Sequence, residues 1–222
     1  LLKSSDEMFS TLDLGMIDLK KGILRCVGKA EQRFREDPLR ILRGLRFASC
    51  FGFSFEEETA KALKKERNGL TKVSGERVRE ELNRLLLGKN VLQVLLNFSS
   101  TFVTIMPELF PTIGFEQHNR YHCYTVYEHL ARAVDSSKNH LTVRMALLLH
   151  DVGKPSCFTQ DEQNNGHFYA HAKISEQYAE IILNRLRYDR KTIERVCQLI
   201  HYHDATIEVE ERNVKRWLNR LG

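Results

Sequence analysis

The stretch that decides the fold is residues 33–48, which read RFREDPLRILRGLRFA. Its apolar side chains recur at three-residue steps, the spacing that places them on one face of a helix, as Leu39, Leu42 and Leu45. Pro38 suits the first turn of this helix and Asp37 suits its N-cap. Residues 78–87 and 142–149 repeat helical spacing or are apolar throughout. We therefore predict an all-α fold.

One segment departs from the helical pattern. Residues 22–28 read GILRCVG, a short apolar run closed by glycine at both ends, which is typical of a β-strand. We expect this strand to have no partner. The predicted architecture is a helical body with a short β remnant near the N-terminus.

The composition of the chain changes near residue 117. All nine histidines lie after that position. Residues 106–114, just before it, contain two of the four prolines and interrupt the helical pattern on either side. A chain of 222 residues is long enough for one large domain or two small ones. We place a linker in this segment and predict divisions at residues 1–28, 29–117 and 118–222.

Composition sets limits on location and partners. Lysine and arginine total 34 against 29 aspartate and glutamate, a surplus that permits a polyanionic partner without requiring one. The five cysteines never form a C-x-x-C pair, which argues against a disulfide framework or a zinc ribbon and fits a reducing cytoplasm. No apolar run approaches the roughly 18 residues of a membrane helix, so we expect a cytoplasmic protein with no membrane partner. The chain begins Leu1-Leu2-Lys3, and we expect it to be a fragment.

The helix start at Asp37 is basic. Residues 25–47 hold seven basic and three acidic residues, and Asp37 and Arg40 are spaced to face the same way. A carboxylate only accepts hydrogen bonds and a guanidinium only donates them, so together they match a base edge with an amino donor beside a ring-nitrogen acceptor. Cytosine and adenine present that edge, whereas guanine and uracil would leave polar groups unsatisfied at about 1–3 kcal/mol each. The alternative is that Asp37 caps the helix and the arginines form a solvated face.

Residues 33–48 closely resemble the E-D-x-x-R helix of bacterial tRNA nucleotidyltransferases, the CCA-adding and poly(A) polymerase family. Residues 74–82, SGERVREEL, resemble the next helix of that family, and residues 18–27 resemble the end of its catalytic head. The resemblance implies that residues 1–28 are a remnant of the head and residues 29–117 a helical neck that binds nucleotide and RNA. It also implies a parent enzyme that adds CMP and AMP to tRNA 3′ ends.

The same resemblance implies roles for individual residues. Asp37 and Arg40 would read the incoming CTP or ATP, with Arg43 and Glu36 near the same pocket. The family's head carries a G-S motif and a D-x-D pair that hold two magnesium ions, and no D-x-D occurs in these 222 residues. We therefore expect that this chain alone does not transfer nucleotides and that Mg²⁺ belongs with the missing head.

A second cluster of polar residues lies in the histidine-rich half. Residues 143–154 read VRMALLLHDVGK, an apolar helix that ends in a His-Asp doublet followed by glycine. Several polar residues accompany the doublet, namely His122, His129, His167, His171, His201, His203 and Asp204. Imidazole and carboxylate suit divalent transition metals, and a metal at such a site could support phosphate ester hydrolysis. For single histidines such as His118 and His140, a surface or core role is the favoured interpretation.

The order of His129, His150-Asp151 and Asp204 resembles the HD phosphohydrolase superfamily. Residues 166–172, GHFYAHA, and Tyr202-His203-Asp204 resemble the HD domain fused to many bacterial tRNA nucleotidyltransferases. The resemblance implies an HD domain at residues 118–222. It implies a divalent metal (Ni²⁺, Mn²⁺ or Mg²⁺) held by His129, His150, Asp151 and Asp204, with His150 and Asp151 catalytic.

The remaining polar residues of this cluster have more than one interpretation. His171 and His203 are candidates for a second metal or for phosphate contact. Lys154 could balance charge on a substrate phosphate, or it could be a helix-end lysine that is favoured there by the helix dipole.

Two alternatives to this function stay open, and oligomeric state is a third question. The chain could be a free-standing HD-domain metal-dependent phosphatase or phosphodiesterase whose N-terminal helices only scaffold it. It could instead be a non-catalytic RNA-binding module. A homodimer is a further hypothesis.

Four aromatic residues lie close together in the sequence, namely Phe47, Phe51, Phe53 and Phe55. We interpret them as core residues and not as a base-stacking surface.

Overall fold

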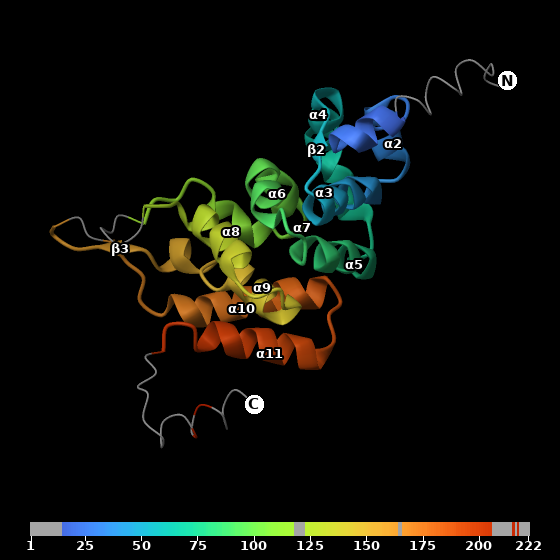
Figure 1. Ribbon diagram of the computed structural model, residues 1–222. Coiled ribbons are helices and arrows are strands. Elements are labelled where there is room, and N and C mark those ends of the chain that lie inside the picture. The colour runs from blue at the N-terminus through green and yellow to red at the C-terminus, as the bar shows by residue number, and fades with distance from the viewer. Residues whose placement is uncertain (1–14, 118–122, 164–165, 206–214, 216, 218–222) are drawn as a thin grey trace, which may run out of the picture. The chain divides into compact units, whose positions relative to one another are not determined.

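The computed structural model describes residues 15–117, 123–163, 166–205, 215 and 217 (Figure 1). In these residues most of the chain is helical, with two small two-stranded sheets, which confirms the predicted all-α class with a short β element. Contacts divide the chain into two compact units, Leu1–Pro107 and Glu108–Gly222, which we call the first and second units. No helix in the described part is long and apolar enough to cross a membrane. Residues 1–14 of the expected head remnant, and His118 and His122, lie outside the described residues.

The first unit is a set of short helices around a leucine-rich core. A helical stretch at residues 15–21 leads into its elements. These are β1 (Ile23–Leu24), α2 (Ala30–Glu36), α3 (Leu39–Phe51), β2 (Ser54–Phe55), α4 (Glu57–Glu66), η1 (Arg67–Lys72), α5 (Gly75–Leu86), α6 (Val91–Asn97) and α7 (Ser99–Ile105). α3 packs against α5, and α2 packs against α4. The α3 to α5 contact includes a hydrogen bond from the buried Ser49 hydroxyl to the Leu85 carbonyl at 2.7 Å.

The strand predicted at residues 22–28 is shorter than expected and has a partner. β1 pairs in parallel with β2, with Ile23 opposite Ser54 and Leu24 opposite Phe55. The Ser54 N–H donates to the Gly22 carbonyl at 2.9 Å. The expectation of an unpaired strand was wrong because β2 has only two residues, too few to show an alternating pattern in the sequence.

The central helix α3 follows the predicted amphipathic pattern. Its inward side chains are buried, namely Leu39, Ile41, Leu42, Leu45 and Ala48. The helix begins at Leu39, with Pro38 and not Asp37 at the N-cap position. The Asp37 carboxylate nevertheless accepts a hydrogen bond from the Leu39 N–H at 3.3 Å. Because Pro38 has no N–H, the amide of Leu39 is the first that Asp37 can bind. At the other end Gly52 has a φ of 74°, the left-handed conformation that favours glycine at a helix terminus.

In its described residues the second unit contains four α-helices and a small hairpin. Its elements are α8 (Val126–Ser136), α9 (Leu141–Leu149), η3 (Lys154–Cys157), β3 (Thr159–Gln160), β4 (Gly166–His167), α10 (His171–Arg185) and α11 (Arg190–His201), preceded by η2 (Pro107–Thr112). α8 starts with a capping box in which Thr125 and Glu128 bind each other's backbone N–H groups. α10 and α11 lie side by side, and α9 packs against both α8 and α11 (Figure 1). This packing gathers the end of α9, the start of α10 and the segment after α11.

Candidate functional sites

The first candidate site lies at the junction of α2 and α3. Glu36 is the last residue of α2, and Asp37 follows it in extended backbone conformation. Glu36 accepts hydrogen bonds from the Arg33 guanidinium at 2.9 Å and from the Arg40 guanidinium at 3.3 Å. Arg40 also donates to the Arg33 carbonyl at 3.1 Å. These bonds fix the guanidinium of Arg40 beside the junction while leaving a third of its side chain exposed.

The Asp37 carboxylate is surrounded by guanidinium groups at longer range. Its oxygens lie 3.9 Å from Arg40 Nε, 3.7 Å from an Arg43 Nη and 3.9 Å from an Arg77 Nη. These distances are ion-pair distances, longer than those of hydrogen bonds. The carboxylate is 27 % exposed, so a ligand can reach it. The structure thus brings together all four residues predicted for nucleotide contact, and it adds Arg77, which the sequence reasoning missed.

Glu81 is a second residue that the sequence reasoning missed. Its carboxylate accepts hydrogen bonds from Arg43 Nε at 3.3 Å and from Arg46 Nε at 2.7 Å. Because Glu81 is largely buried on α5, it anchors the arginines of α3 to that helix. Residues 74–82, which resemble the family's next helix, lie at the start of α5, and Glu81 links that helix to α3. Its separation of 35 residues from Arg46 left no local pattern to find.

An apolar cleft of about 350 Å³ lies next to this junction. Four arginines contribute to its lining, namely Arg25, Arg33, Arg40 and Arg43. Its apolar lining comes mainly from Leu24, Phe34, Phe47 and Phe55. Arg40 and Arg43 therefore contact both the Asp37 carboxylate and an apolar cavity, a combination suited to a planar ligand that carries polar edges.

Two aromatic residues expected in the core lie on the surface. Phe47 is 37 % and Phe51 54 % exposed, and their rings stack at 5.9 Å. The Arg46 guanidinium lies 4.2 Å from the centre of the Phe47 ring. The core interpretation was wrong for these two because they lie on the face of α3 opposite the buried leucines. Phe55 is only partly exposed and contacts Phe98 edge-on at 5.2 Å.

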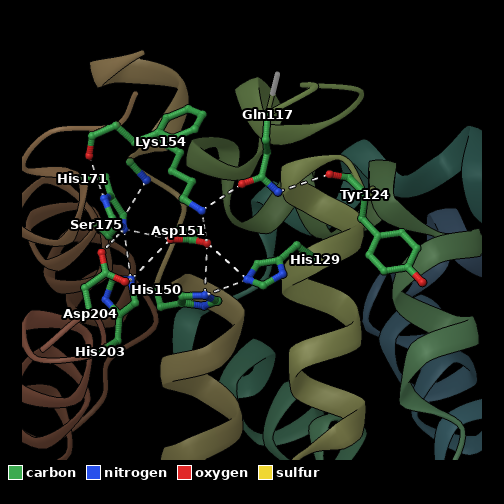
Figure 2. A network of polar contacts seen from close by, with 12 residues as sticks. Gln117, Tyr124, His129, His150, Asp151, Lys154, His171, Ser175, His203 and Asp204 are labelled. Carbon is green, nitrogen blue, oxygen red and sulfur yellow. Dashed lines mark hydrogen bonds and ion pairs between the residues drawn. The ribbon is translucent and has the colours of Figure 1, made fainter. Parts of the chain in front are cut away.

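The second candidate site is a cluster of imidazoles around one carboxylate in the second unit (Figure 2). His129 comes from α8, the His150-Asp151 doublet from the end of α9, and His171 from the first position of α10. Directly after α11 come His203 and Asp204. The helix packing described above brings these segments to one place. All of the residues predicted as ligands are therefore close together.

Asp151 occupies the centre of this cluster and is nearly fully buried. Its Oδ2 lies 3.3 Å from His129 Nε2 and 3.2 Å from His150 Nε2. Its Oδ1 lies 3.2 Å from His171 Nε2 and 3.5 Å from His203 Nε2. Asp204 is exposed and approaches the second pair, with 3.0 Å between its Oδ2 and His171 Nε2. The two oxygens of one carboxylate thus face two separate pairs of imidazoles.

The protonation of three rings follows from their other nitrogen. The Nδ1 atoms of His150, His171 and His203 lie 2.7–2.8 Å from the backbone carbonyls three residues earlier. A carbonyl only accepts, so each Nδ1 carries a proton, and in the neutral form of each ring Nε2 presents a lone pair. Metal-binding histidines in proteins are oriented in this way by their second nitrogen. The Nε2 atoms also lie 3.1 Å apart in the pairs His129–His150 and His171–His203, a distance at which two lone pairs repel unless a proton or a metal ion lies between them.

The electrostatics of Asp151 agree with a cation site. Burial by itself raises the pKa of this carboxyl, but the four imidazoles of His129, His150, His171 and His203 around it together hold its pKa well below its usual range. The carboxylate is therefore ionised. Its Oδ1 is buried and makes no hydrogen bond within the described residues. Burial by itself lowers the pKa of His203, but the Asp151 side chain and the Ile200 carbonyl raise it overall.

Two groups of side chains in the described residues have donor atoms close enough to share a metal ion. One is His129, His150 and Asp151, and the other is Asp151, His171 and His203. Both contain imidazole nitrogens and an ionised carboxylate, the donors that divalent transition metals prefer. The unsatisfied Oδ1 of Asp151 and the lone pairs on Nε2 fit a bound cation. The residues present therefore fit a divalent metal, and the histidine-aspartate cluster is a candidate metal site.

Lys154 and Gln117 complete the surroundings of Asp151. Lys154 is buried, and its Nζ lies 2.8 Å from Asp151 Oδ2 and 2.9 Å from Gln117 Oε1. Gln117 in turn donates from Nε2 to the Tyr124 carbonyl at 3.2 Å (Figure 2). Lys154 was a candidate from the sequence, but Gln117 was not, because it is separated by 37 residues from Lys154. His140 and His167 do not join the cluster, and His167 pairs with Asp161 at 3.0 Å.

Two families of known proteins match the chain in successive segments. Residues 52–112 match the family described as the probable RNA and SrmB-binding site of polymerase A. Residues 119–218 match the HD domain family. An HD domain is thus present where the cluster around Asp151 lies. Successive segments of the chain thus match a polymerase RNA-binding family and the HD domain family.

Three curated relatives are tRNA nucleotidyltransferases of different specificity. The A-adding tRNA nucleotidyltransferase of Deinococcus radiodurans is 30% identical over 93% of this chain and 50% of its own length. The CC-adding tRNA nucleotidyltransferase of Thermus thermophilus is 32% identical over 91% of this chain and 49% of its own length. The CCA-adding enzyme of Leuconostoc mesenteroides is 45% identical over 42% of this chain and 23% of its own length.

Solved structures of similar fold are also CCA-adding enzymes. The Bacillus stearothermophilus enzyme in complex with CTP matches with a TM-score of 0.62 and 23% identity, over 93% of this chain and 45% of that one. The Thermotoga maritima enzyme complexed with tRNA matches with a TM-score of 0.51 and 20% identity, over 93% of this chain and 43% of that one. At these identities the likeness establishes the fold.

These findings define the chain first as a helical region that matches an RNA-binding family, joined to an HD domain. More narrowly, it is similar over most of its length to tRNA nucleotidyltransferases. The chain spans about half the length of the two relatives that it matches over most of its own length.

Proposed function

We propose that the chain is the nucleotide-selecting and RNA-binding part of an enzyme that adds CMP and AMP to tRNA 3′ ends. The observation that carries this proposal is the Asp37 carboxylate among the guanidinium groups of Arg40 and Arg43, at the edge of an apolar cleft. The similarity to tRNA nucleotidyltransferases supports it, as does the complex of the Bacillus stearothermophilus enzyme with CTP. In this proposal CTP and ATP are the nucleotides, and Mg²⁺ acts with a catalytic head outside this chain.

The chemistry of selection follows from donors and acceptors. Asp37 can accept from the exocyclic amino group of cytosine or adenine, while Arg40 donates to the neighbouring ring nitrogen. Guanine and uracil would place donors against the guanidinium and acceptors against the carboxylate, at about 1–3 kcal/mol for each unsatisfied group. Glu36 holds the Arg40 guanidinium, and Glu81 holds that of Arg43. These two carboxylates would keep the reading groups in place.

The test uses the intact enzyme that contains this chain. Asp37→Ala and Arg40→Ala should each lose discrimination against GTP and UTP more than they lose total incorporation, measured by sequencing the tRNA 3′ ends. Glu57→Ala, on the exposed face of α4, is the control and should leave selection unchanged. Equal misincorporation by the wild type and both variants would refute the assignment.

We propose a second activity for the second unit, hydrolysis of phosphate esters that depends on a divalent metal. The observation that carries it is the set of Nε2 lone pairs that converge on the buried Asp151 carboxylate. In this proposal His129, His150, Asp151 and Asp204 are metal ligands, and His171 and His203 hold a second ion or contact phosphate. The substrate class is a nucleoside phosphomonoester or 2′,3′-cyclic phosphate, as at a damaged tRNA 3′ end.

The roles of the protein groups can be stated separately. Asp151 would bridge the two imidazole pairs, and the backbone carbonyls that hold His150, His171 and His203 would fix their ring orientation. Lys154 would hold positive charge beside a substrate phosphate. When bound, a divalent ion of this kind polarises a phosphoryl oxygen and lowers the pKa of a coordinated water.

The test is incubation of the chain with Ni²⁺, Mn²⁺ or Mg²⁺ and either a 2′,3′-cyclic nucleotide or p-nitrophenyl phosphate. Turnover that requires the metal, and that is lost in Asp151→Asn, would support the proposal. His167→Ala is the matched control, because this histidine pairs with Asp161 and not with Asp151. No turnover with any metal, together with no metal in the purified protein, would favour a structural role for the domain.

Finer assignments accompany these proposals. We propose a head remnant at residues 1–28, a neck at 29–117 and an HD domain at 118–222, supported by the HD match that begins at residue 119. We also propose a cytoplasmic enzyme that binds tRNA, with a homodimer as the assembly to be tested by light scattering.

A further inference from the structure

A buried ammonium group stands beside the candidate metal site. Lys154 has 6 % of its surface exposed and lies in the first position of η3. Its three N–H groups need partners, because burial of an unpaired charge is costly. Asp151 Oδ2 at 2.8 Å and Gln117 Oε1 at 2.9 Å accept two of them. The Phe168 ring, centred 5.3 Å from Nζ, closes one side of the group.

The orientation of the Gln117 amide is determined by its two partners. An ammonium only donates, so the atom that faces Lys154 must be the carbonyl oxygen. The Tyr124 backbone carbonyl only accepts, so the atom that faces it at 3.2 Å must be the amide nitrogen. Gln117 itself is 2 % exposed. It therefore links Lys154 to the segment that enters α8, and neither end of the amide can exchange with the other.

The backbone at Gln117 is also held on several sides. A Cβ on Gly166 would lie 2.5 Å from the Gln117 carbonyl oxygen, so β4 approaches this residue as closely as glycine permits. Two residues earlier, the Phe115 carbonyl accepts from the Val126 N–H at 3.0 Å. The Phe115 ring contacts the rings of Phe158 and Phe168 edge-on. These contacts make residues 115–117 a rigid support for the amide.

We propose that Gln117 is a positioning residue that holds the Lys154 ammonium beside Asp151, where its charge acts on the phosphate of a substrate. The inference rests on the proposed hydrolase function of the second unit. Within the described residues, Lys154 has no third hydrogen-bond acceptor, which leaves one N–H for a phosphoester oxygen. The HD family match begins at residue 119, so Gln117 lies before it.

The consequence is a dependence of Lys154 on Gln117. Asp151 would be shared between Lys154 and a bound metal, which weakens its hold on the ammonium. Gln117 then supplies the acceptor that keeps the ammonium from turning away. Gln117→Met removes this acceptor at similar size, whereas Gln117→Glu keeps an oxygen for Lys154 but loses the donor to Tyr124.

The first readout is independent of activity. In the metal-free chain labelled with ¹⁵N-lysine, a buried, hydrogen-bonded ammonium gives a slowly exchanging Nζ signal. We expect this signal in the wild type. Its loss in Lys154→Arg assigns the signal to Lys154. The signal should also be lost in Gln117→Met and be retained in Gln117→Glu. Thr112→Val is the matched control. Thr112 is a buried polar residue at the end of η2, and its hydroxyl donates to the Leu109 carbonyl and not to Lys154. An unchanged signal in Gln117→Met, or none in the wild type, would overturn the proposal.

The second readout is a double-mutant cycle on the Mn²⁺-loaded chain with a 2′,3′-cyclic nucleotide. We expect Gln117→Met to lower kcat/KM by about 10-fold, the size of one lost hydrogen bond. In the Lys154→Met background, Gln117→Met should cause no further loss. Additive losses would overturn the positioning role even where both variants fold. If the wild type turns over no phosphoester, the hydrolase proposal fails, and the NMR signal alone decides whether Gln117 positions Lys154.

Discussion

Asp151 illustrates how one residue sets the chemistry of the second unit. A buried carboxylate normally gains a proton, yet four imidazoles keep this one ionised. In three of those rings Nδ1 donates its proton to a backbone carbonyl. When such a ring is neutral, its Nε2 has no proton to donate to Asp151. Either extra protons or metal cations must occupy the space between the rings. Metal binding should therefore release protons and weaken at acid pH.

The two imidazole pairs predict the number of ions bound. We expect the wild type to bind two Mn²⁺ per chain, His129→Ala to keep the ion at His171 and His203, and Asp151→Asn to lose affinity for both by on the order of 100-fold. Isothermal titration calorimetry with elemental analysis measures both stoichiometry and affinity. His167→Ala should match the wild type. A single ion in the wild type that survives His129→Ala unchanged would contradict the pairing.

At the residue scale, the candidate metal ligands could be predicted from the sequence, but the residues that position their neighbours could not. His129, the His150-Asp151 doublet and the later histidines could be picked out because they match a family order, and the structure brings them together. Gln117, Arg77 and Glu81 could not be found in the same way. Each acts on a partner 35 or more residues away through a single side chain, which leaves no periodic pattern in the sequence.

At the scale of elements, Glu56 connects three parts of the first unit. It is the N-cap of α4, where its Oε2 accepts from the Thr59 N–H at 2.8 Å and from the Thr59 hydroxyl at 2.7 Å. Thr59 Oγ1 in turn accepts from the Cys26 N–H just after β1 at 3.1 Å. The second Glu56 oxygen lies 3.5 Å from an Arg25 Nη. One carboxylate thus ties α4 to the small parallel sheet.

This connection predicts a pH dependence of stability. Hydrogen bonds from Thr59, and less strongly the charge of Arg25, lower the pKa of Glu56 below its usual 4.5. A carboxyl with a lowered pKa stabilises the fold fully above its unfolded-state pKa, and it loses that contribution as the pH falls through its folded-state pKa. Glu56→Gln should therefore lower the free energy of unfolding by about 1 kcal/mol at neutral pH, and the difference from the wild type should shrink below about pH 4.5.

Urea unfolding of both proteins from about pH 7 to pH 3 measures this difference. Glu58→Gln is the control, since Glu58 lies in the same first turn of α4 but its side chain is 76 % exposed and pairs with Lys61, which is also exposed. A difference for Glu56→Gln that stays constant across the pH range would show that the carboxylate contributes no ionisation-dependent stability.

Elements were predictable to the extent that they are long. α3 and α9 are runs in which successive turns repeat the same apolar spacing or stay apolar throughout, and both were expected from the sequence. β2 is two residues long, and the side-chain alternation that identifies a strand needs more than that. Phe47 and Phe51 were wrongly predicted to lie in the core. Aromatic residues close together in a sequence are typical of a core, and only their positions on the helix relative to the buried leucines show that they face outward.

At the scale of the whole molecule, the positive charge is unevenly distributed. Residues 1–107 carry 19 lysines and arginines against 14 acidic residues, whereas residues 108–222 carry 15 of each. The surplus of five thus lies entirely in the first unit, which contains the greater part of the segment that matches the RNA-binding family. A polyanion should be attracted to the first unit by charge, while the second unit would rely on its site.

This asymmetry predicts how tRNA binding responds to salt and to charge reversal. Binding of tRNA to the chain should weaken as KCl rises, because phosphate contacts release counterions. Lys72→Glu, an exposed position in the matched RNA-binding segment, should weaken binding and reduce the slope of log K against log salt by about 1. Lys191→Glu, also exposed and on α11, is its matched control and should change neither quantity. Filter binding across a KCl series measures both. Equal effects of the two reversals would place the tRNA contacts on both units and remove the basis for assigning RNA binding to the first.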